Sequence, residues 1–247
     1  MVIVQPLSLE FEVRGFDCGY GGPLRLLSLA NFFQETAGEH ADQIGYGVGK
    51  LLAEGRTWML SRIDLRIDDL PRAGERVRVM TQPAGTERLF ALRDLAMTGS
   101  DGRSLARAVY AYLVVDLATR RLMRPDRLFG EAIPVGAAPH PLSGHLFDLP
   151  PAAATEVSFA QRAWARHIDH NGHVNNAWLL DWLADAAPED QRPVAPMAMR
   201  VEFLAEALEG DELLAAWGRA EGGILSELRR GGEIIARAFL DHRPLLG

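Results

Sequence analysis

The sequence predicts an α+β protein made of two similar units, each an antiparallel β-sheet wrapped around one long α-helix. Three observations predict it: a weak internal repeat, an amphipathic helical pattern near the start of each repeat, and strand-like runs separated by glycine turns. Residues 200–217 can be laid on residues 64–81 at an offset of 136, which places Gly210-Asp211 on Gly74-Glu75. We therefore expect the chain to contain two copies of one structural unit.

In the first unit, apolar residues recur at three- and four-residue steps from Leu26 to Ile44, and Gly45 follows them. That spacing is typical of an amphipathic helix, and glycine commonly ends one. Strand-like runs come next, separated by turn signals such as Arg72-Ala73-Gly74. We expect four strands, at residues 58–67, 76–82, 88–98 and 104–116.

The second unit follows the same plan. We expect its helix at about 174–186 and its strands at 197–204, 211–220, 223–230 and 233–242. Strands joined by short glycine turns pair antiparallel, and one long apolar helix has to cover a face of such a sheet. Residues 131–155 are rich in Pro, Ala and Gly, so we expect a linker there between units at 1–130 and 156–247.

Composition narrows the class of protein. Of the 247 residues, 48% are apolar and 24% charged, which is typical of a globular chain, and no apolar run approaches the ~20 residues of a membrane span. The net charge of −7 argues against nucleic acid as the main partner. The single cysteine, Cys18, excludes an internal disulfide and a cysteine-based zinc site. We expect a soluble protein of the cytoplasm.

A dense polar cluster, R-H-I-D-H-N-G-H-V-N-N, stands directly before the second helix. Helix capping explains any one of its residues, but one helix end needs only one or two caps. As a group they predict a site that positions water and polarises a carbonyl oxygen at the free N–H groups of a helix start. The polar members are Asp169, His170, Asn171, His173, Asn175 and Asn176. The first unit has Asp17–Gly22 before its helix, without His or Asn, and we expect it to be catalytically silent.

Glu206 is the second candidate, because the first unit has Leu70 at the matching position. A carboxylate near the polar turn of the same unit could activate water. A solvated loop glutamate beside Glu202, Glu209 and Asp211 is the other interpretation, and the residues alone favour it.

Five segments carry a resemblance to a known family. They are N-F-F-Q-E-T-A-G-E-H-A (31–41), R-T-W-M-L-S-R-I (56–63) and A-T-R-R-L-M-R-P (118–125) in the first half, with residues 168–182 and 201–207 in the second. Together they resemble the acyl-acyl carrier protein (acyl-ACP) thioesterases of plants and bacteria, which are built from two hot-dog units in tandem. The likeness runs from about Leu7 to Leu240, and its first half discriminates, since D-x-x-G-H-V-N-N alone also fits single hot-dog acyl-CoA thioesterases.

The resemblance implies a double hot-dog fold and hydrolysis of a fatty acyl thioester in fatty acid biosynthesis, without metal or organic cofactor. The family's catalytic pattern falls on Asp169, Asn171, His173, Asn175 and Asn176, and its acidic residue on Glu206. We expect Glu206 to be the general base, Asn171 and His173 to hold the water or the thioester carbonyl, Asp169 to orient His173 or the helix-start amides, and Asn175 and Asn176 to bind substrate. Ala207 stands where plant members often carry Cys, so a Cys–His–Asn mechanism is not available there.

The resemblance also places the acyl chain in the first unit, between its helix and its sheet. The candidate lining residues are Phe32, Phe33, Trp58, Leu60, Leu89 and Phe90, although most apolar residues of such a unit are ordinary core. The implied partner is acylated acyl carrier protein, an acidic protein, so a local basic patch would bind it. The candidates for that contact are Arg120, Arg121, Arg124 and Arg166, with a solvated charged face as the alternative.

Two other functions stay open at this point. One is the same chemistry on acyl-CoA, and the other is a non-catalytic acyl-binding hot-dog protein, against which the polar cluster at 169–176 argues. A single hot-dog unit needs two copies to build a site and this chain supplies both, so a monomer would suffice and homodimers remain open.

Overall fold

The computed structural model describes residues 2–130, 134–135, 149–151, 155–189, 195 and 197–241. The chain divides into two compact units, Met1–Ser61 with Asp69–Gly144 (unit 1) and Arg62–Asp68 with His145–Gly247 (unit 2). The boundary cuts strand β3 (Arg56–Ile67), whose second half belongs to unit 2. Most of the linker expected at 131–155 lies outside the described residues, but residues 134–135 in it form a short strand, β8 (Pro134–Val135).

Unit 1 is an antiparallel sheet of long strands. Its order is β4 (Arg76–Glu87), β5 (Phe90–Gly99), β6 (Ser104–Asp116) and β3, and β2 (Leu7–Glu12) pairs with β4 at the far edge. The short β7 (Arg121–Met123) pairs with β6, while β8 pairs with β4 and with β1 (Val2–Ile3). The pairing of β4 with β5 and of β5 with β6 places buried residues of the three strands side by side on one face of the sheet.

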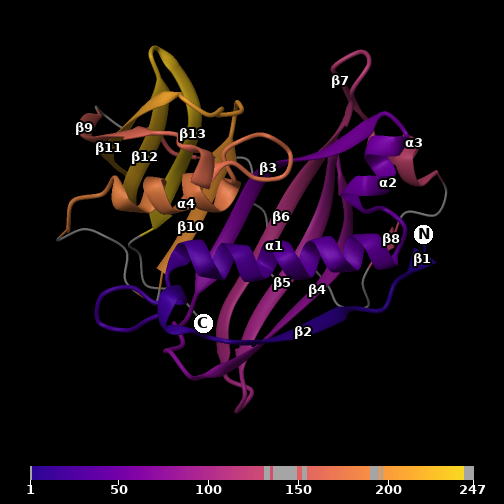
Figure 1. The fold of residues 1–247 in the computed structure, drawn as a ribbon, viewed down its shortest axis with the longest axis horizontal. Helices are drawn as coiled ribbons and strands as arrows, with labels where there is room; N and C mark the ends of the chain where they lie inside the picture. Colours follow the sequence, from indigo (N-terminus) through magenta and orange to yellow (C-terminus); the bar gives the residue numbers. More distant parts are fainter. Residues whose placement is uncertain are drawn as a thin grey trace. The chain divides into compact units, whose positions relative to one another are not determined.

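Helix α1 (Leu26–Gln43) covers that face and runs across the strands (Figure 1). Its 18 residues make it about 27 Å long, and it packs on β2, β4 and β5. Phe33 is 0% exposed and meets Tyr110 of β6 edge to face, with ring centroids 6.3 Å apart. Burying such a ring stabilises the fold by roughly 1.5–3 kcal/mol. Unit 1 also contains two short α-helices, α2 (Val48–Ala53) and α3 (Pro125–Phe129), and a 3-10 helix at Gly15–Asp17.

Unit 2 repeats this plan with a shorter helix. Its strand order is residues 62–67 of β3, β10 (Met197–Phe203), β13 (Glu233–Asp241), β12 (Gly223–Arg230), β11 (Glu212–Ala220) and β9 (Glu156–Arg162), all antiparallel. Helix α4 (Asn176–Asp185) packs on β12 and β13 (Figure 1). None of the helices in the described part of the chain is both long and apolar enough to cross a membrane.

The repeat holds at the level of single hydrogen bonds. Many backbone bonds of unit 1 recur in unit 2. Among them are Val13 N to Glu75 O and Ala163 N to Asp211 O, Leu24 N to Pro71 O and Val174 N to Ala207 O, and Arg25 N to Asp17 O and Asn175 N to His167 O. The offset is 150 residues for the segment before each helix (Val13 to Ala163) and 136 for the strands (Glu75 to Asp211).

This register corrects one detail of the sequence alignment. Asp17 stands before the first helix as Asp169 stands before the second, but its counterpart in unit 2 is His167. Asp169, Asn171 and His173 correspond instead to Gly19, Gly21 and Pro23. The two turns keep the same backbone path, with polar side chains at these three positions in unit 2 alone.

Candidate active site

The polar cluster forms a tight turn before α4. Asp169 N donates to His173 O at 2.8 Å, Gly172 N donates to Asp169 O at 3.0 Å, and Ile168 and Val174 form an isolated β-bridge that closes the turn. Gly172 has φ +84°, a left-handed conformation that a residue with a Cβ rarely adopts. The turn therefore needs glycine at this position so that residues 169 and 173 lie opposite each other and form their hydrogen bond.

Asp169 holds Asn171 in this turn. Its Oδ1 accepts from Asn171 N at 2.8 Å, and its Oδ2 accepts from Asn171 Nδ2 at 3.4 Å. The sequence analysis assigns Asp169 to orienting His173 or the helix-start amides, whereas the structure shows its carboxylate bound to Asn171. It fixes the side chain that we expect to hold the water or the thioester carbonyl.

Asn175 and Asn176 mark the start of α4. Asn175 is the N-cap, and its Oδ1 accepts from Ala177 N at 2.9 Å. Asn176 is the first residue of the helix, and both are half-buried. Helix capping therefore accounts for the amide oxygen of Asn175, and a contact of either residue with substrate stays a prediction.

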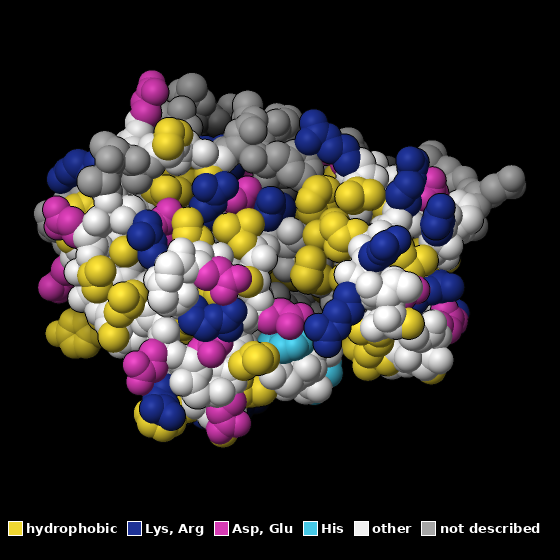
Figure 2. Space-filling model, turned by 90° about the horizontal axis from the view of Figure 1, so that it is seen from above, with side chains coloured by type: hydrophobic (Ala, Val, Ile, Leu, Met, Phe, Trp, Pro, Cys, Tyr) yellow, Lys and Arg dark blue, Asp and Glu magenta, His cyan; other side chains and the backbone are white. Residues whose placement is uncertain are grey.

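His173 and Glu206 meet at the surface of unit 2. His173 Nε2 lies 3.2 Å from Glu206 Oε2, and their side chains are 36% and 60% exposed. Val174 N donates to Ala207 O at 2.8 Å, which ties the turn to the loop after β10. A neutral imidazole beside a carboxylate carries its proton on the facing nitrogen. On the face drawn in Figure 2, histidine side chains likewise reach the surface against an acidic side chain.

His167 lies beneath the turn and was missed by the sequence analysis. It is 3% exposed and its ring lies 4.9 Å from Trp178 and 5.0 Å from Trp182, while its carbonyl accepts from Asn175 N. Burial, with a smaller contribution from Arg166, lowers the pKa of His167. A neutral, buried imidazole suits support of the turn, and its only sequence signal was its place in the polar run.

The candidate acyl-lining residues divide by burial. Phe33 and Leu60 are buried; Phe32, Trp58 and Phe90 are half-buried. Trp58 Nε1 donates to Tyr46 O at 2.8 Å. Leu89, in the turn between β4 and β5, is 37% exposed, so it is the least suited of the six to line an interior site.

A polar group inside unit 1 was also missed. Arg93 Nη1 donates to His40 Nδ1 at 2.9 Å and to Thr81 Oγ1 at 3.3 Å, and His40 Nε2 donates to Gln5 O at 3.0 Å. His40 is 2% exposed; burial, then the nearby guanidinium, lowers its pKa. The charged Arg-Asp pair within an apolar strand, F-A-L-R-D-L-A-M, was the available signal.

The four arginines expected to contact carrier protein are all exposed. Arg120, Arg121 and Arg124 lie around β7 in unit 1, and Arg166 lies in the short 3-10 helix before the polar turn of unit 2. Arg124 pairs with Asp126 at 3.1 Å. Basic and acidic side chains are interspersed on the face in Figure 2. Within the described residues, His, Cys, Asp and Glu side chains form no group of three or more that could hold a metal ion.

Comparison with known proteins decides the family. The family model of the acyl-ACP thioesterase N-terminal domain matches residues 7–127, and that of the C-terminal domain matches residues 152–242. The chain belongs to the acyl-ACP thioesterase family. Each half of the chain therefore matches one of the two domains of this family, in agreement with the resemblance seen in the first half of the sequence.

Similar proteins of this family come from plants and bacteria. Over 193 residues the chain is 28% identical to the chloroplastic palmitoyl-acyl carrier protein thioesterase of Gossypium hirsutum, covering 73% of this chain and 47% of that one. It is 25% identical over 203 residues to oleoyl-acyl carrier protein thioesterase 2 of Arabidopsis thaliana, covering 73% and 54%. The chain spans about half the length of the curated relatives it matches.

Solved structures share the fold. The acyl-ACP thioesterase of Bacteroides thetaiotaomicron superimposes with a TM-score of 0.82 at 24% identity, covering 96% of this chain and 97% of that one. The 12:0-ACP thioesterase of Umbellularia californica gives 0.80 at 19% identity, covering 97% of both chains. These likenesses confirm the double hot-dog fold that the sequence predicted.

Proposed function

We propose that this chain hydrolyses fatty acyl-ACP to free fatty acid and carrier protein by general-base attack of water. The observation that carries the proposal is the contact of His173 Nε2 with Glu206 Oε2 at 3.2 Å. It occurs in a chain of the acyl-ACP thioesterase family, whose curated relatives carry names of this activity. A non-catalytic acyl-binding protein would have no use for this pair.

In the proposed reaction Glu206 takes a proton from water, and the oxygen of that water bonds to the thioester carbonyl carbon. Asn171 and His173 hold the water and the carbonyl oxygen, and their polar groups stabilise the negative charge that develops on that oxygen. The C–S bond then breaks, and the proton held by Glu206 goes to the departing sulfur. Glu206 is 60% exposed, so water reaches its carboxylate without any rearrangement.

The acyl chain is proposed to bind within unit 1, between α1 and the sheet, and unit 2 to carry the chemistry. The support is the difference between the two turns. Unit 1 has Gly19, Gly21 and Pro23 where unit 2 has Asp169, Asn171 and His173, and Leu70 where unit 2 has Glu206. Cytoplasmic location and homodimer formation stay predictions.

The test compares purified protein on acyl-ACP and acyl-CoA of the same chain length. We expect a higher kcat/KM on acyl-ACP, and a large preference for acyl-CoA would overturn the carrier-protein assignment. A variant with Arg120→Glu, Arg121→Glu and Arg124→Glu adds a second measurement. It should raise KM for acyl-ACP more than KM for acyl-CoA, because the acidic carrier protein offers these arginines a larger charged surface than the anionic CoA does.

A further inference from the structure

The loop that carries Glu206 is held by an arginine from a neighbouring strand. Arg230, at the end of β12, donates from Nη1 to Glu206 O at 3.2 Å and to Asp211 Oδ2 at 2.7 Å. Its Nη2 donates to Glu233 Oε2 at 2.7 Å. Asp211 Oδ2 also accepts from Leu208 N at 2.9 Å, inside the same loop. We call Arg230 and Asp211 the loop clamp.

The clamp and the polar turn bind successive peptides of this loop. The carbonyl of Glu206 accepts from Arg230, and the carbonyl of Ala207 accepts from Val174 N at 2.8 Å. The residue that reaches His173 is therefore fixed on one side by β12 and on the other by the turn before α4. Since Glu206 lies outside any strand or helix and its side chain is 60% exposed, these main-chain contacts set where its carboxylate can reach.

The charges of the clamp are internally paired. Burial acts to raise the pKa of the Asp211 carboxyl, but the Leu208 amide and the Arg230 guanidinium outweigh it and hold the pKa below its ordinary value. Arg230 in turn binds two carboxylates, those of Asp211 and Glu233. A guanidinium that already pairs with two carboxylates is better suited to hold the loop in place than to bind a substrate phosphate.

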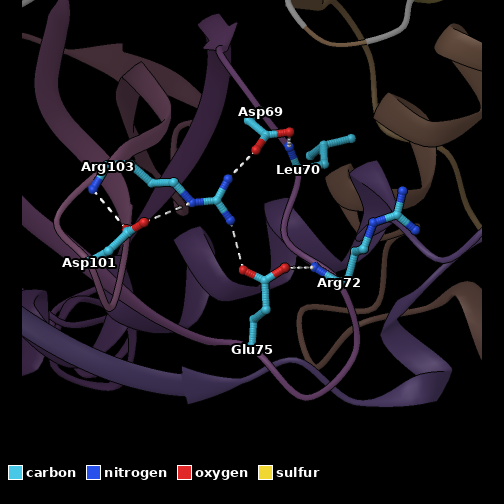
Figure 3. Close-up of polar contacts among 6 residues, drawn as sticks. All are labelled: Asp69, Leu70, Arg72, Glu75, Asp101 and Arg103. Carbon is cyan, nitrogen blue, oxygen red and sulfur yellow. Dashed lines mark hydrogen bonds and ion pairs between the residues drawn. The ribbon is translucent and has the colours of Figure 1, made fainter.

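Unit 1 contains a corresponding cluster of an arginine and carboxylates, but it has no glutamate at the position of Glu206 (Figure 3). Arg103, on the other side of the matching hairpin turn, binds Glu75 Oε2 at 2.7 Å and also the carboxylates of Asp69 and Asp101. Glu75 Oε1 accepts from Arg72 N at 2.8 Å, as Asp211 accepts from Leu208 N. Leu70 occupies the position of Glu206. The arginine here contacts the side chain of Asp69, while Arg230 contacts the main chain of Glu206 itself.

We propose that Arg230 and Asp211 are positioning residues for catalysis, which hold the Glu206 peptide so that its carboxylate reaches His173 and the attacking water. This inference rests on the proposed function. Its physical basis is that a general base must lie within hydrogen-bond reach of its proton, and that a displacement of about 1 Å can cost up to about a hundredfold in rate. Asp211 acts through Arg230 and Leu208, and neither clamp residue touches the substrate.

The experiment measures kcat and KM on acyl-ACP for Arg230→Gln, Asp211→Asn and Arg230→Lys, each with its urea unfolding curve. We expect Arg230→Gln and Asp211→Asn to lower kcat roughly tenfold with KM changed less than about twofold. Arg230→Lys should recover part of kcat, because one ammonium can still reach Glu206 O or Asp211. Arg103→Gln is the matched control: it removes the same kind of clamp from unit 1 and should leave kcat within about twofold.

A double variant separates positioning from general loosening. If Arg230 acts through Glu206, Arg230→Gln should slow the Glu206→Gln protein by less than about twofold. An equal loss in both backgrounds, or unchanged kcat in both Arg230→Gln and Asp211→Asn, would overturn the clamp. Parent-like turnover of Glu206→Gln alone would instead overturn the proposed general base, so the two failures are distinguishable.

Discussion

His173 Nε2 lies 3.2 Å from Glu206 Oε2, and the peptides next to both residues are joined by the hydrogen bond from Val174 N to Ala207 O. Unit 1 keeps that backbone bond, from Leu24 N to Pro71 O at 2.8 Å, but has Pro23 and Leu70 at the side-chain positions. The backbone contact between turn and loop is thus present in both units, with or without catalytic side chains. Only unit 2 carries an imidazole and a carboxylate beside this contact.

Removal of either member of this pair should abolish most activity. We expect Glu206→Gln and His173→Ala each to lower kcat at least about a hundredfold, the range measured for acid–base groups. The matched change in unit 1, Leu70→Ala, should leave turnover largely intact. Near-parental rates in both unit 2 variants, with circular dichroism showing an intact fold, would contradict the mechanism.

Asn175 tests capping against substrate binding. Its Oδ1 accepts from Ala177 N at 2.9 Å, so Asn175→Ala should lower the free energy of unfolding by about 1 kcal/mol. Asn175→Asp keeps an N-cap acceptor and should retain the stability. If capping is its whole role, Asn175→Asp also keeps KM. A KM that rises severalfold at parental stability would show that the amide contacts substrate.

Much of the fold could be predicted because glycine turns and apolar periodicity are local signals. The helix expected at 26–44 is Leu26–Gln43, and the strand expected at 223–230 is Gly223–Arg230. The outer strands β2 and β9 were missed. β2, L-S-L-E-F-E, alternates apolar and polar residues, so a strand signal was present in the sequence and was overlooked. β9 is exposed over its first three residues, and its pairing with β11 decides its conformation.

The candidate site was predictable in its residue types but not in its supports. Asp169, Asn171 and His173 stand out because polar groups of catalytic type gather before a helix, whereas Glu206 was singled out by its contrast with Leu70 and by the family resemblance. The clamp gave no such signal, since Arg230 acts on a main-chain carbonyl, and any residue could supply that acceptor. Asp17 also precedes a helix, but its counterpart in unit 2 is His167, and the counterpart of Asp169 in unit 1 is Gly19.

Asp94 should make unit 1 sensitive to pH. It is 4% exposed, its Oδ1 has no hydrogen-bond partner, and Gln82 Nε2 lies 3.5 Å from its Oδ2. Burial raises the pKa of Asp94 from its ordinary value of 3.8 to about 6, against a smaller opposing effect of Gln82. The native state thus holds a proton that the unfolded chain releases between about pH 4 and pH 6.

The sign of the effect follows from this proton. Because the native state binds more protons than the unfolded chain between about pH 4 and pH 6, the Asp94 contribution to unfolding free energy falls as pH rises through that window and stays low above it. A shift of this size corresponds to about 3 kcal/mol. Asp94→Asn should therefore stabilise the protein by up to that amount at pH 8, and by little near pH 4. Urea unfolding of both proteins across this range measures the difference, with Glu87→Gln, exposed at the end of β4, as the control that should give none. A constant difference between parent and Asp94→Asn at every pH would show that the carboxyl does not titrate in the window, and that the change acts through packing alone.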